Sequence, residues 1–317
     1  MPSPGQVAVG RVSLPHGRLM ATLAVLTLAC GTEPAAPGSR IAFLGFLPET
    51  VSLFSMESDG RDVRRLSDTT LLASNASWSP DGRRLVFSAN PRDGEISNLY
   101  LVNADGTGLR PVLANGADNR EPVWSPDGKR IAFTSFRTDS QHVIVEAVRI
   151  WVMQADGSNA VPITEGTTAS WSADSRRLVF VREVSDDGIT TGLFLVNSDG
   201  SGGVVPLTDP RPLADTDGYP DWSPSGDFIA FTRTRLGSAI TATTWVIRPD
   251  GSGLRELATT SPETYQPSWS PDETEIVVSD ASDGQLKAVN VANPATVRLF
   301  GSLPATVNDA AEWGPAR

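Results

Sequence analysis

Ser77-Trp78-Ser79-Pro80-Asp81-Gly82 is the stretch that decides the fold, because the same phrase recurs along the chain. It returns as Val123–Gly128, with Val in the first position, and four further copies are less complete. Six of the eight tryptophans occupy its second position: Trp78, Trp124, Trp171, Trp222, Trp269 and Trp313. They lie 44 to 51 residues apart. A regular period in this range is the signature of a repeat protein.

Each phrase combines a tight turn with the strand that follows it. Pro at the second turn position presets φ, and Asp and Gly suit the third and fourth positions of a type I turn. A short run of β-branched and aromatic residues comes next, such as Leu85–Phe87, and predicts a strand. A second run ends in an Asp-Gly pair, for example Asp105-Gly106. This pair predicts a hairpin, because both residues accept positive φ.

Six such units predict an all-β fold, a six-bladed β-propeller built from four-stranded antiparallel blades. The tryptophans are expected to fill the space between neighbouring blades, since one blade cannot bury both of its faces alone. The two chain ends together supply one blade. Ile41–Phe43 matches the strand that follows a tryptophan but has no phrase before it, and Trp313 has only four residues after it. The propeller, residues 40–317, is therefore predicted to close by pairing its N- and C-terminal strands.

The first 29 residues have the order of a secretory signal peptide. Arg11 and Arg18 precede an uncharged apolar stretch, residues 19–29, that is too short to span a bilayer. Residues 30–39 follow as a flexible tether rich in Gly, Pro and Ala.

The apolar stretch ends at Cys30, the only cysteine of the chain. Leu26–Gly31 resembles the lipobox of bacterial lipoproteins, although Thr27 departs from the usual Leu. The resemblance implies that Cys30 is lipidated and anchors a periplasm-facing domain to a membrane. Gly31 in place of Asp implies the outer membrane rather than the inner one. The alternatives are an ordinary cleaved signal peptide with a chance cysteine, and a buried free thiol.

Charge and composition narrow the possible functions. The chain carries a net charge of −11, and removing residues 1–29 takes away two basic residues and no acidic ones, which makes it −13. Nucleic acids are bound through Lys and Arg, so this balance argues against them and suits a partner that is basic or brings divalent cations. His142 is the only histidine after the signal peptide, and no G-x-S-x-G motif occurs. We expect no catalytic residues, no metal and no cofactor.

The phrase S-W-S-P-D-G-[KR]-x-[IL]-[AV]-F, followed later by D-G-[ST], resembles the TolB-like family of β-propeller repeats over residues 40–317. Such repeats occur in periplasmic TolB and in relatives of prolyl oligopeptidase. TolB carries an α/β domain before its propeller, and the peptidases carry a catalytic domain. Neither is expected here, so neither the Tol-Pal role nor peptidase activity transfers with the fold.

The predicted chain path gives the ring two different faces. The S-P-D-G turns and Asp-Gly hairpins lie on one face, the turn face. The links between blades and the loops after each second strand lie on the other, the loop face. The loop-face segments are long and irregular, and such loops on a rigid scaffold usually carry recognition.

Candidate partner-binding residues lie in these loops or just before the tryptophans. They combine Arg and Tyr, which are enriched in binding hot spots, with acidic side chains. They are Arg120, Glu121, Arg137, Asp187, Tyr219, Arg233, Arg235 and Tyr265. The alternative is that the charged residues are merely solvated and that the two tyrosines cap the core.

We therefore expect a non-enzymatic, monomeric propeller of the bacterial cell envelope that binds a protein or peptide partner. The alternative is a carbohydrate-binding or carbohydrate-active propeller that uses the central funnel. Related lyases use several histidines and a metal, whereas this chain has a single histidine, His142, after the predicted signal peptide. A purely structural envelope component is a third possibility.

Overall fold

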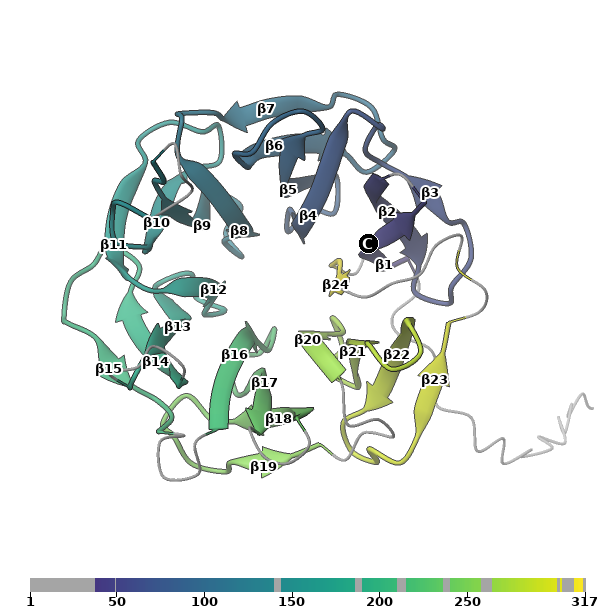
Figure 1. The fold of residues 1–317 in the computed structure, drawn as a ribbon. Coiled ribbons are helices and arrows are strands. Elements are labelled where there is room, and N and C mark those ends of the chain that lie inside the picture. Colours follow the sequence, from purple (N-terminus) through teal and green to yellow (C-terminus); the bar gives the residue numbers. More distant parts are fainter. Residues whose placement is uncertain are drawn as a thin grey trace, which may run out of the picture. The chain divides into compact units, whose positions relative to one another are not determined.

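The computed structural model describes residues 38–48, 50–139, 144–185, 190–209, 215–235, 240–257, 264–300, 303 and 311–315. They belong to one compact unit, Pro34–Arg317. The described strands form six four-stranded antiparallel sheets arranged around a central axis (Figure 1). No helix in this part of the chain is long and apolar enough to cross a membrane. The predicted signal peptide, Cys30 and His142 lie outside the described residues.

Each blade runs outward from an inner strand to a short outer strand. The inner strands are β4 (Leu71–Trp78), β8 (Asp118–Trp124), β12 (Thr167–Trp171), β16 (Asp215–Trp222), β20 (Thr264–Trp269) and β24 (Ala311–Trp313). The second strands are β5 (Arg84–Pro91), β9 (Arg130–Phe136), β13 (Arg177–Glu183), β17 (Ile229–Arg235), β21 (Glu275–Asp280) and β1 (Arg40–Leu47). The third strands are β6 (Asn98–Asn103), β10 (Arg149–Gln154), β14 (Thr191–Asn197), β18 (Thr241–Ile247), β22 (Gln285–Asn290) and β2 (Thr50–Glu57). The outer strands are β7 (Arg110–Leu113), β11 (Val161–Glu165), β15 (Val205–Pro206), β19 (Arg255–Glu256), β23 (Val297–Leu299) and β3 (Arg64–Arg65).

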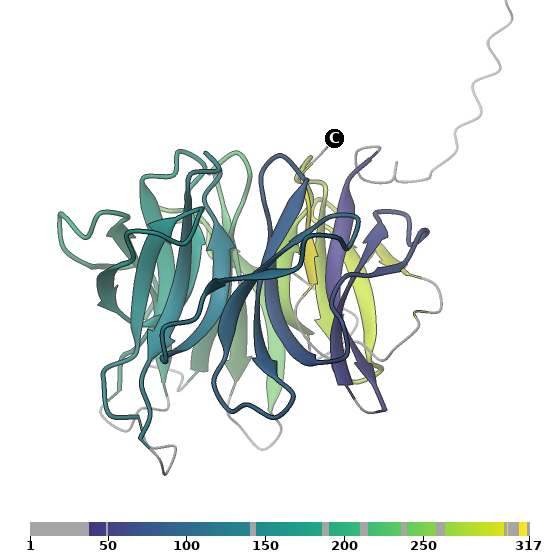
Figure 2. The same cartoon turned by 90° about the horizontal axis from the view of Figure 1, so that it is seen from above.

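The ring closes as the sequence predicts. The last strand, β24, pairs antiparallel with the first strand, β1, and Ile41 lies opposite Trp313. The resulting sheet has the order β24-β1-β2-β3, so the two ends of the chain share one blade (Figure 1). Figure 2 shows the strands standing between the two faces of the ring. The predicted fold class is confirmed.

The hydrophobic core is divided into six clusters, and each lies between two neighbouring blades. Trp124 packs with Leu99 and Leu101 of the preceding blade. Trp313 packs in the same way with Leu286 and Ala288. All six tryptophans of the phrase are between 4% and 6% exposed, which confirms that they belong to the interior. Burial of large aromatic side chains therefore joins each blade to the next.

The arginines that follow the turns cover these tryptophans. The guanidinium of Arg84 lies 5.3 Å from the ring of Trp124, and that of Arg130 lies 4.7 Å from the ring of Trp171. In each case the arginine belongs to the blade before the tryptophan. A cation placed over an indole face is attractive, and the aliphatic part of the arginine shields the ring from water. The basic positions of the repeat thus contribute to the same joints as the tryptophans.

The hairpins form where the Asp-Gly pairs predict them, but the expectation that both residues of the pair take positive φ is wrong for the aspartate. Only the glycine has positive φ, +85° at Gly106, and Asp105 does not. The amide of Gly106 donates to the carbonyl of Asn103 at 2.8 Å, as in a type I turn followed by a left-handed glycine. Asp105 instead accepts the amide of Thr107 at 2.9 Å. Hydrogen bonds from Thr107 hold the pKa of Asp105 below its usual value.

Deleting residues 311–317 should destabilise the whole ring, because it removes β24 and the buried side chain of Trp313. Loss of a buried tryptophan alone costs about 3–5 kcal/mol, a large share of the net stability of a domain. Thermal unfolding monitored by circular dichroism measures the effect, and deletion of residues 316–317 alone is the control. A melting temperature equal to that of the full chain would contradict the closure by β24.

Candidate functional site

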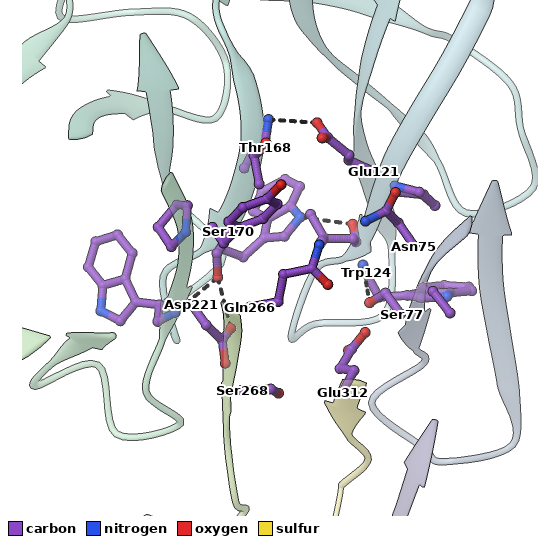
Figure 3. A pocket seen from close by; sticks show the side chains of 18 of the residues that line it. Asn75, Ser77, Glu121, Trp124, Thr168, Ser170, Asp221, Gln266, Ser268 and Glu312 are labelled. Atoms are coloured by element: carbon purple, nitrogen blue, oxygen red, sulfur yellow. Dashed lines mark hydrogen bonds between the residues drawn. The ribbon is translucent and has the colours of Figure 1, made fainter. Parts of the chain in front are cut away.

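A cavity of about 230 Å³ lies at the centre of the ring, and all six blades contribute to its wall (Figure 3). Its lining residues come from the last positions of the inner strands, which run toward the turn face. Pro126 of one S-P-D-G turn also lines it. The cavity therefore occupies the half of the central channel next to the turn face, and we call it the channel pocket.

In five of the six repeats, the third residue before the tryptophan of the phrase lies in a β-bulge of the inner strand. These residues have positive φ although none is glycine, and they are Asn75 (29°), Glu121 (53°), Thr168 (47°), Tyr219 (51°) and Gln266 (52°). Positive φ costs a non-glycine residue roughly 1–2 kcal/mol, and for the β-branched Thr168 it is a marked outlier. Bulges change the direction of a side chain, and here all five residues line the channel pocket. The repeat thus places five different side chains at equivalent positions of one cavity.

A circle of hydrogen bonds joins the inner strands below these bulges. The residue just before one tryptophan accepts a hydrogen bond from the backbone amide of the tryptophan in the next blade. The donor–acceptor pairs are Trp124–Ser77 at 3.1 Å, Trp222–Ser170 at 3.0 Å, Trp269–Asp221 at 2.9 Å, Trp313–Ser268 at 3.2 Å and Trp78–Glu312 at 3.2 Å. Val123 cannot accept through its side chain, and there the indole of Trp171 donates to the carbonyl of Val123 at 3.1 Å. Buried amides that would lack a partner in their own sheet are satisfied in this way.

Two members of this circle, Asp221 and Glu312, are carboxylates, and both point into the channel pocket (Figure 3). Each is deeply enclosed but partly accessible to water in the channel. Burial raises the pKa of Asp221 from 3.8 to about 6, against the hydrogen bonds from Trp269 and Ser170 that favour its charged form. Burial also raises the pKa of Glu312 well above its usual value, and the charge of Asp221 raises it further. The pocket therefore holds two coupled acids whose ionised forms are disfavoured.

Of the partner-binding residues predicted from the sequence, Tyr219 and Glu121 meet in the channel pocket. Tyr219 is 38% exposed, so its side chain remains accessible to a ligand. Glu121 is already engaged. One of its carboxylate oxygens accepts the amide of Thr168 at 2.9 Å and the hydroxyl of Thr134 at 2.8 Å. It therefore braces one blade against the next while lining the cavity.

The second tyrosine, Tyr265, does not line the pocket. Tyr219 lies three residues before Trp222, whereas Tyr265 lies four residues before Trp269, so the two are not equivalent in the repeat. Gln266 holds the position that matches Tyr219. The backbone carbonyl of Tyr265 accepts the hydroxyl of Ser279 at 3.3 Å within the sheet.

The four predicted arginines lie away from the pocket, and each is paired with a carboxylate of its own blade. The shortest nitrogen–oxygen distances are 2.7 Å for Arg120–Asp118, 3.7 Å for Arg137–Glu146, 2.6 Å for Arg233–Asp217 and 3.8 Å for Arg235–Asp215. Arg233 is buried between the rings of Phe231 and Trp245, which makes it a structural residue. Arg120, Arg137 and Arg235 remain about half exposed near the loop face. Asp187 lies outside the described residues.

The sequence reasoning missed Asp221, Gln266 and Glu312. A signal for two of them was present in the repeat itself. Serine precedes the tryptophan in three copies of the phrase, whereas Asp221 and Glu312 stand at that position in two others. An acidic residue at a position where the repeat usually has serine is informative when that position faces a shared cavity. The sequence alone does not show which position faces the cavity.

Stability should fall as the pH rises from about 4 to 7, because the folded protein keeps protons on Asp221 and Glu312 that the unfolded chain has lost. For Asp221 the difference between 3.8 and about 6 corresponds to at most roughly 3 kcal/mol, at about 1.4 kcal/mol per pH unit. Urea unfolding at a series of pH values measures this slope. Asp221→Asn should flatten it, and Asp93→Asn on the surface should leave it unchanged. Equal slopes for Asp221→Asn and the unaltered protein would contradict the assignment. The hairpin aspartates, whose pKa values are lowered, act in the opposite direction at more acidic pH.

Comparisons with known proteins agree on the propeller. The Tol-Pal system protein TolB of Syntrophus aciditrophicus is 36% identical over 94 residues, which are 28% of this chain and 20% of that protein. The Tol-Pal system protein TolB of Francisella tularensis subsp. mediasiatica is 25% identical over 240 residues, which are 74% of this chain and 52% of that protein. The chain thus matches about half or less of the length of these relatives. The crystal structure of TolB from Acinetobacter baumannii superposes with a TM-score of 0.71 at 19% identity, over 88% of this chain and 68% of that one. At this identity the superposition shows the fold alone.

The model of the TolB beta propeller domain matches residues 32–272, about three quarters of the chain. The match covers five of the six tryptophan phrases and the bulged strands that carry the channel pocket. The chain therefore belongs to the TolB beta propeller domain family.

Proposed function

We propose that this propeller is a non-enzymatic interaction module that binds a protein or peptide partner at the channel pocket. The observation that carries the proposal is the set of side chains at the five bulges. A structural repeat places equivalent positions around one cavity, yet each blade presents a different residue there, among them Asn75, Glu121 and Tyr219. Rigid elements that present unlike side chains to one point are suited to selective recognition.

The size of the pocket favours a protein over a whole small-molecule ligand. Sites for drug-sized molecules usually measure about 300–1,000 Å³. The channel pocket, at about 230 Å³, is smaller and takes one or two inserted side chains. The remainder of a partner would then rest on the turn face around the channel mouth. Binding hot spots concentrate near the centre of an interface, which is where a side chain inserted into this pocket would lie.

The alternative of a carbohydrate ligand gains no support from the pocket. The described lining residues include the carboxylates Glu121, Asp221 and Glu312 and no Lys, Arg or His. This arrangement repels acidic sugars, because like charges oppose each other in an enclosed site. A purely structural role would not explain why Asp221 and Glu312 are placed in the cavity, where burial disfavours their charged forms.

Tyr219→Ala should weaken partner binding by about 2 kcal/mol, roughly thirtyfold in Kd, because it removes a large amphipathic side chain from the pocket. Tyr265→Ala is the matched control, since it removes the same side chain outside the pocket. A photoreactive amino acid at position 219, in the bacterium that makes the protein, should first capture the partner. The same amino acid at position 265 should not. Titration calorimetry with the purified partner then compares the two alanine variants.

Equal affinity of the Tyr219→Ala variant and the unaltered protein would move the binding site away from the channel pocket. Stronger capture by a reactive group at position 120 or 235 would place it on the loop face, as the sequence analysis expects. The first result excludes the pocket, and the second identifies the face that the partner uses.

The envelope location is part of the same proposal, and it rests on the lipobox-like segment around Cys30 and on the TolB-related propeller. Cys30 would carry the lipid, and residues 31–39 would tether the ring to the periplasmic side of the membrane, with the outer membrane favoured by Gly31. One acyl chain binds membranes only weakly, so stable anchoring requires the full lipid modification of the cysteine.

Cys30→Ser should release the protein from the membrane fraction into the soluble fraction without changing its melting temperature, because the substitution lies outside the ring. Fractionation followed by immunoblotting measures the distribution, and Ser39→Ala provides a control with an intact cysteine. Unchanged association of the Cys30→Ser variant with membranes would contradict the lipid anchor.

A further inference from the structure

The side chains of Asp221 and Glu312 do a structural task that serine does elsewhere in the same chain. At the position before the tryptophan, Ser77, Ser170 and Ser268 satisfy the neighbouring amide with a hydroxyl. Asp221 and Glu312 make the same bond with a carboxylate. Burying a carboxylate costs much more free energy than burying a hydroxyl that is hydrogen-bonded. The circle of hydrogen bonds therefore does not account for the two acids.

Neither carboxylate is compensated by a positive charge in the described part of the chain. No lysine or arginine there forms an ion pair with Asp221 or Glu312, and none lines the channel pocket. Their partners are serine hydroxyls and backbone amides. Most buried acids are paired, so two unpaired acids in one cavity are unusual.

A third acceptor in the pocket also lacks a partner. The side-chain oxygen of Gln266 is buried and has no hydrogen-bond partner among the described residues. Gln266 reaches toward the middle of the pocket in Figure 3, between Asp221 and the opposite wall. A buried acceptor without a donor costs roughly 1–3 kcal/mol. This amide oxygen is therefore an observation independent of the two acids, and it too indicates a missing donor.

We infer that the channel pocket receives a positively charged side chain, the ammonium of a lysine or the guanidinium of an arginine, from the protein partner. Asp221 and Glu312 would bind the charge, and the oxygen of Gln266 would accept a further N–H. This inference deepens the proposed function and rests on it. The net charge of the chain, −11, would add a long-range attraction for a basic partner to the local attraction of the pocket.

An organic cation fits the pocket better than a bare metal ion. Ca²⁺ takes six to eight oxygen ligands, several of them from carboxylates. In the described residues, no three Asp, Glu, His or Cys side chains come close enough together to hold a metal ion. One oxygen of Glu121, the third carboxylate of the pocket, already accepts hydrogen bonds from Thr134 and Thr168. Ammonium and guanidinium groups carry three and five N–H donors, which separated acceptors can share.

The test uses an N-acetylated, C-amidated peptide, Gly-Gly-Lys-Gly-Gly, and the same peptide with norleucine, the uncharged isostere of lysine. Trp124, Trp171 and Trp222 line the pocket, so their fluorescence reports occupancy in a titration of the full chain. The lysine peptide should bind at least about tenfold more tightly than the norleucine peptide at pH 7.5. An arginine peptide should behave like the lysine peptide.

Asp221→Ser combined with Glu312→Ser is the decisive variant. It places serine where three other blades already have it, so the ring should fold and melt no lower than the unaltered protein. It should lose the preference for lysine over norleucine. Asp93→Ser combined with Glu256→Ser removes two exposed acids and controls for the change in net charge. The preference should also shrink by about tenfold between pH 7.5 and pH 5, because protonated carboxyl groups no longer attract the cation.

Several outcomes would overturn the inference. Equal binding of the lysine and norleucine peptides, or an undiminished preference in the Asp221→Ser, Glu312→Ser variant, excludes a cation site. Displacement of the lysine peptide by micromolar CaCl₂ in the unaltered protein alone would assign the pocket to a metal ion. If the lysine peptide binds as expected but a photoreactive group at position 219 captures no protein, the cation site stands as a small-amine site and the proposed function fails. If a protein is captured at position 219 but the lysine peptide shows no preference, the proposed function stands and the cation site is excluded.

Discussion

The structure depends above all on how each blade is joined to the next. A tryptophan at the end of every inner strand packs into the preceding blade, and its backbone amide donates to a side chain of that blade at five of the six joints. Apolar burial supplies most of the free energy of each joint, and the hydrogen bond sets the direction in which the neighbouring strands approach. Because the joints form a closed circle, no blade can move without straining two neighbours. The central channel inherits this rigidity, and the site lies in it.

Rigidity explains why unfavourable local features persist in the channel. In a less rigid scaffold, local rearrangement would relieve the backbone strain of the five non-glycine residues with positive φ and expose the two buried carboxylates to water. Here the surrounding sheets hold these residues in place. The favourable burial of six core clusters offsets the free energy that the strain and the buried charges cost. Strain and buried charge that persist in this way are typical of functional sites. The channel pocket, rather than the loop face, is where the molecule concentrates such features.

Most of the fold could be predicted from the sequence, because its determinants are local and repeated. The turn in Ser79–Gly82, the strand after it and the tryptophan before it recur with variations in five units, and the two unmatched ends imply the closure. The site was harder, since side-chain direction alternates along a strand. Relative to the tryptophan that ends its strand, Tyr265 lies only one position further back than Tyr219, yet Tyr219 lines the pocket and Tyr265 does not. The pairing of Arg233 with Asp217 depends in the same way on the register of β16 and β17, which no local pattern states.

The pairing of β1 with β24 also bears on how the molecule is made. About 270 residues separate the two strands, so the blade that contains β1 has no inner strand until β24 has been synthesised. At about 5–20 residues per second, β24 follows β1 by roughly 15 to 50 seconds. During this interval β1 presents a row of unpaired amides and carbonyls, which can template aggregation with other chains. A chain truncated before β24 keeps this edge of β1 unpaired. Pairing with β24 therefore protects the edge of β1 from association with the strands of other chains.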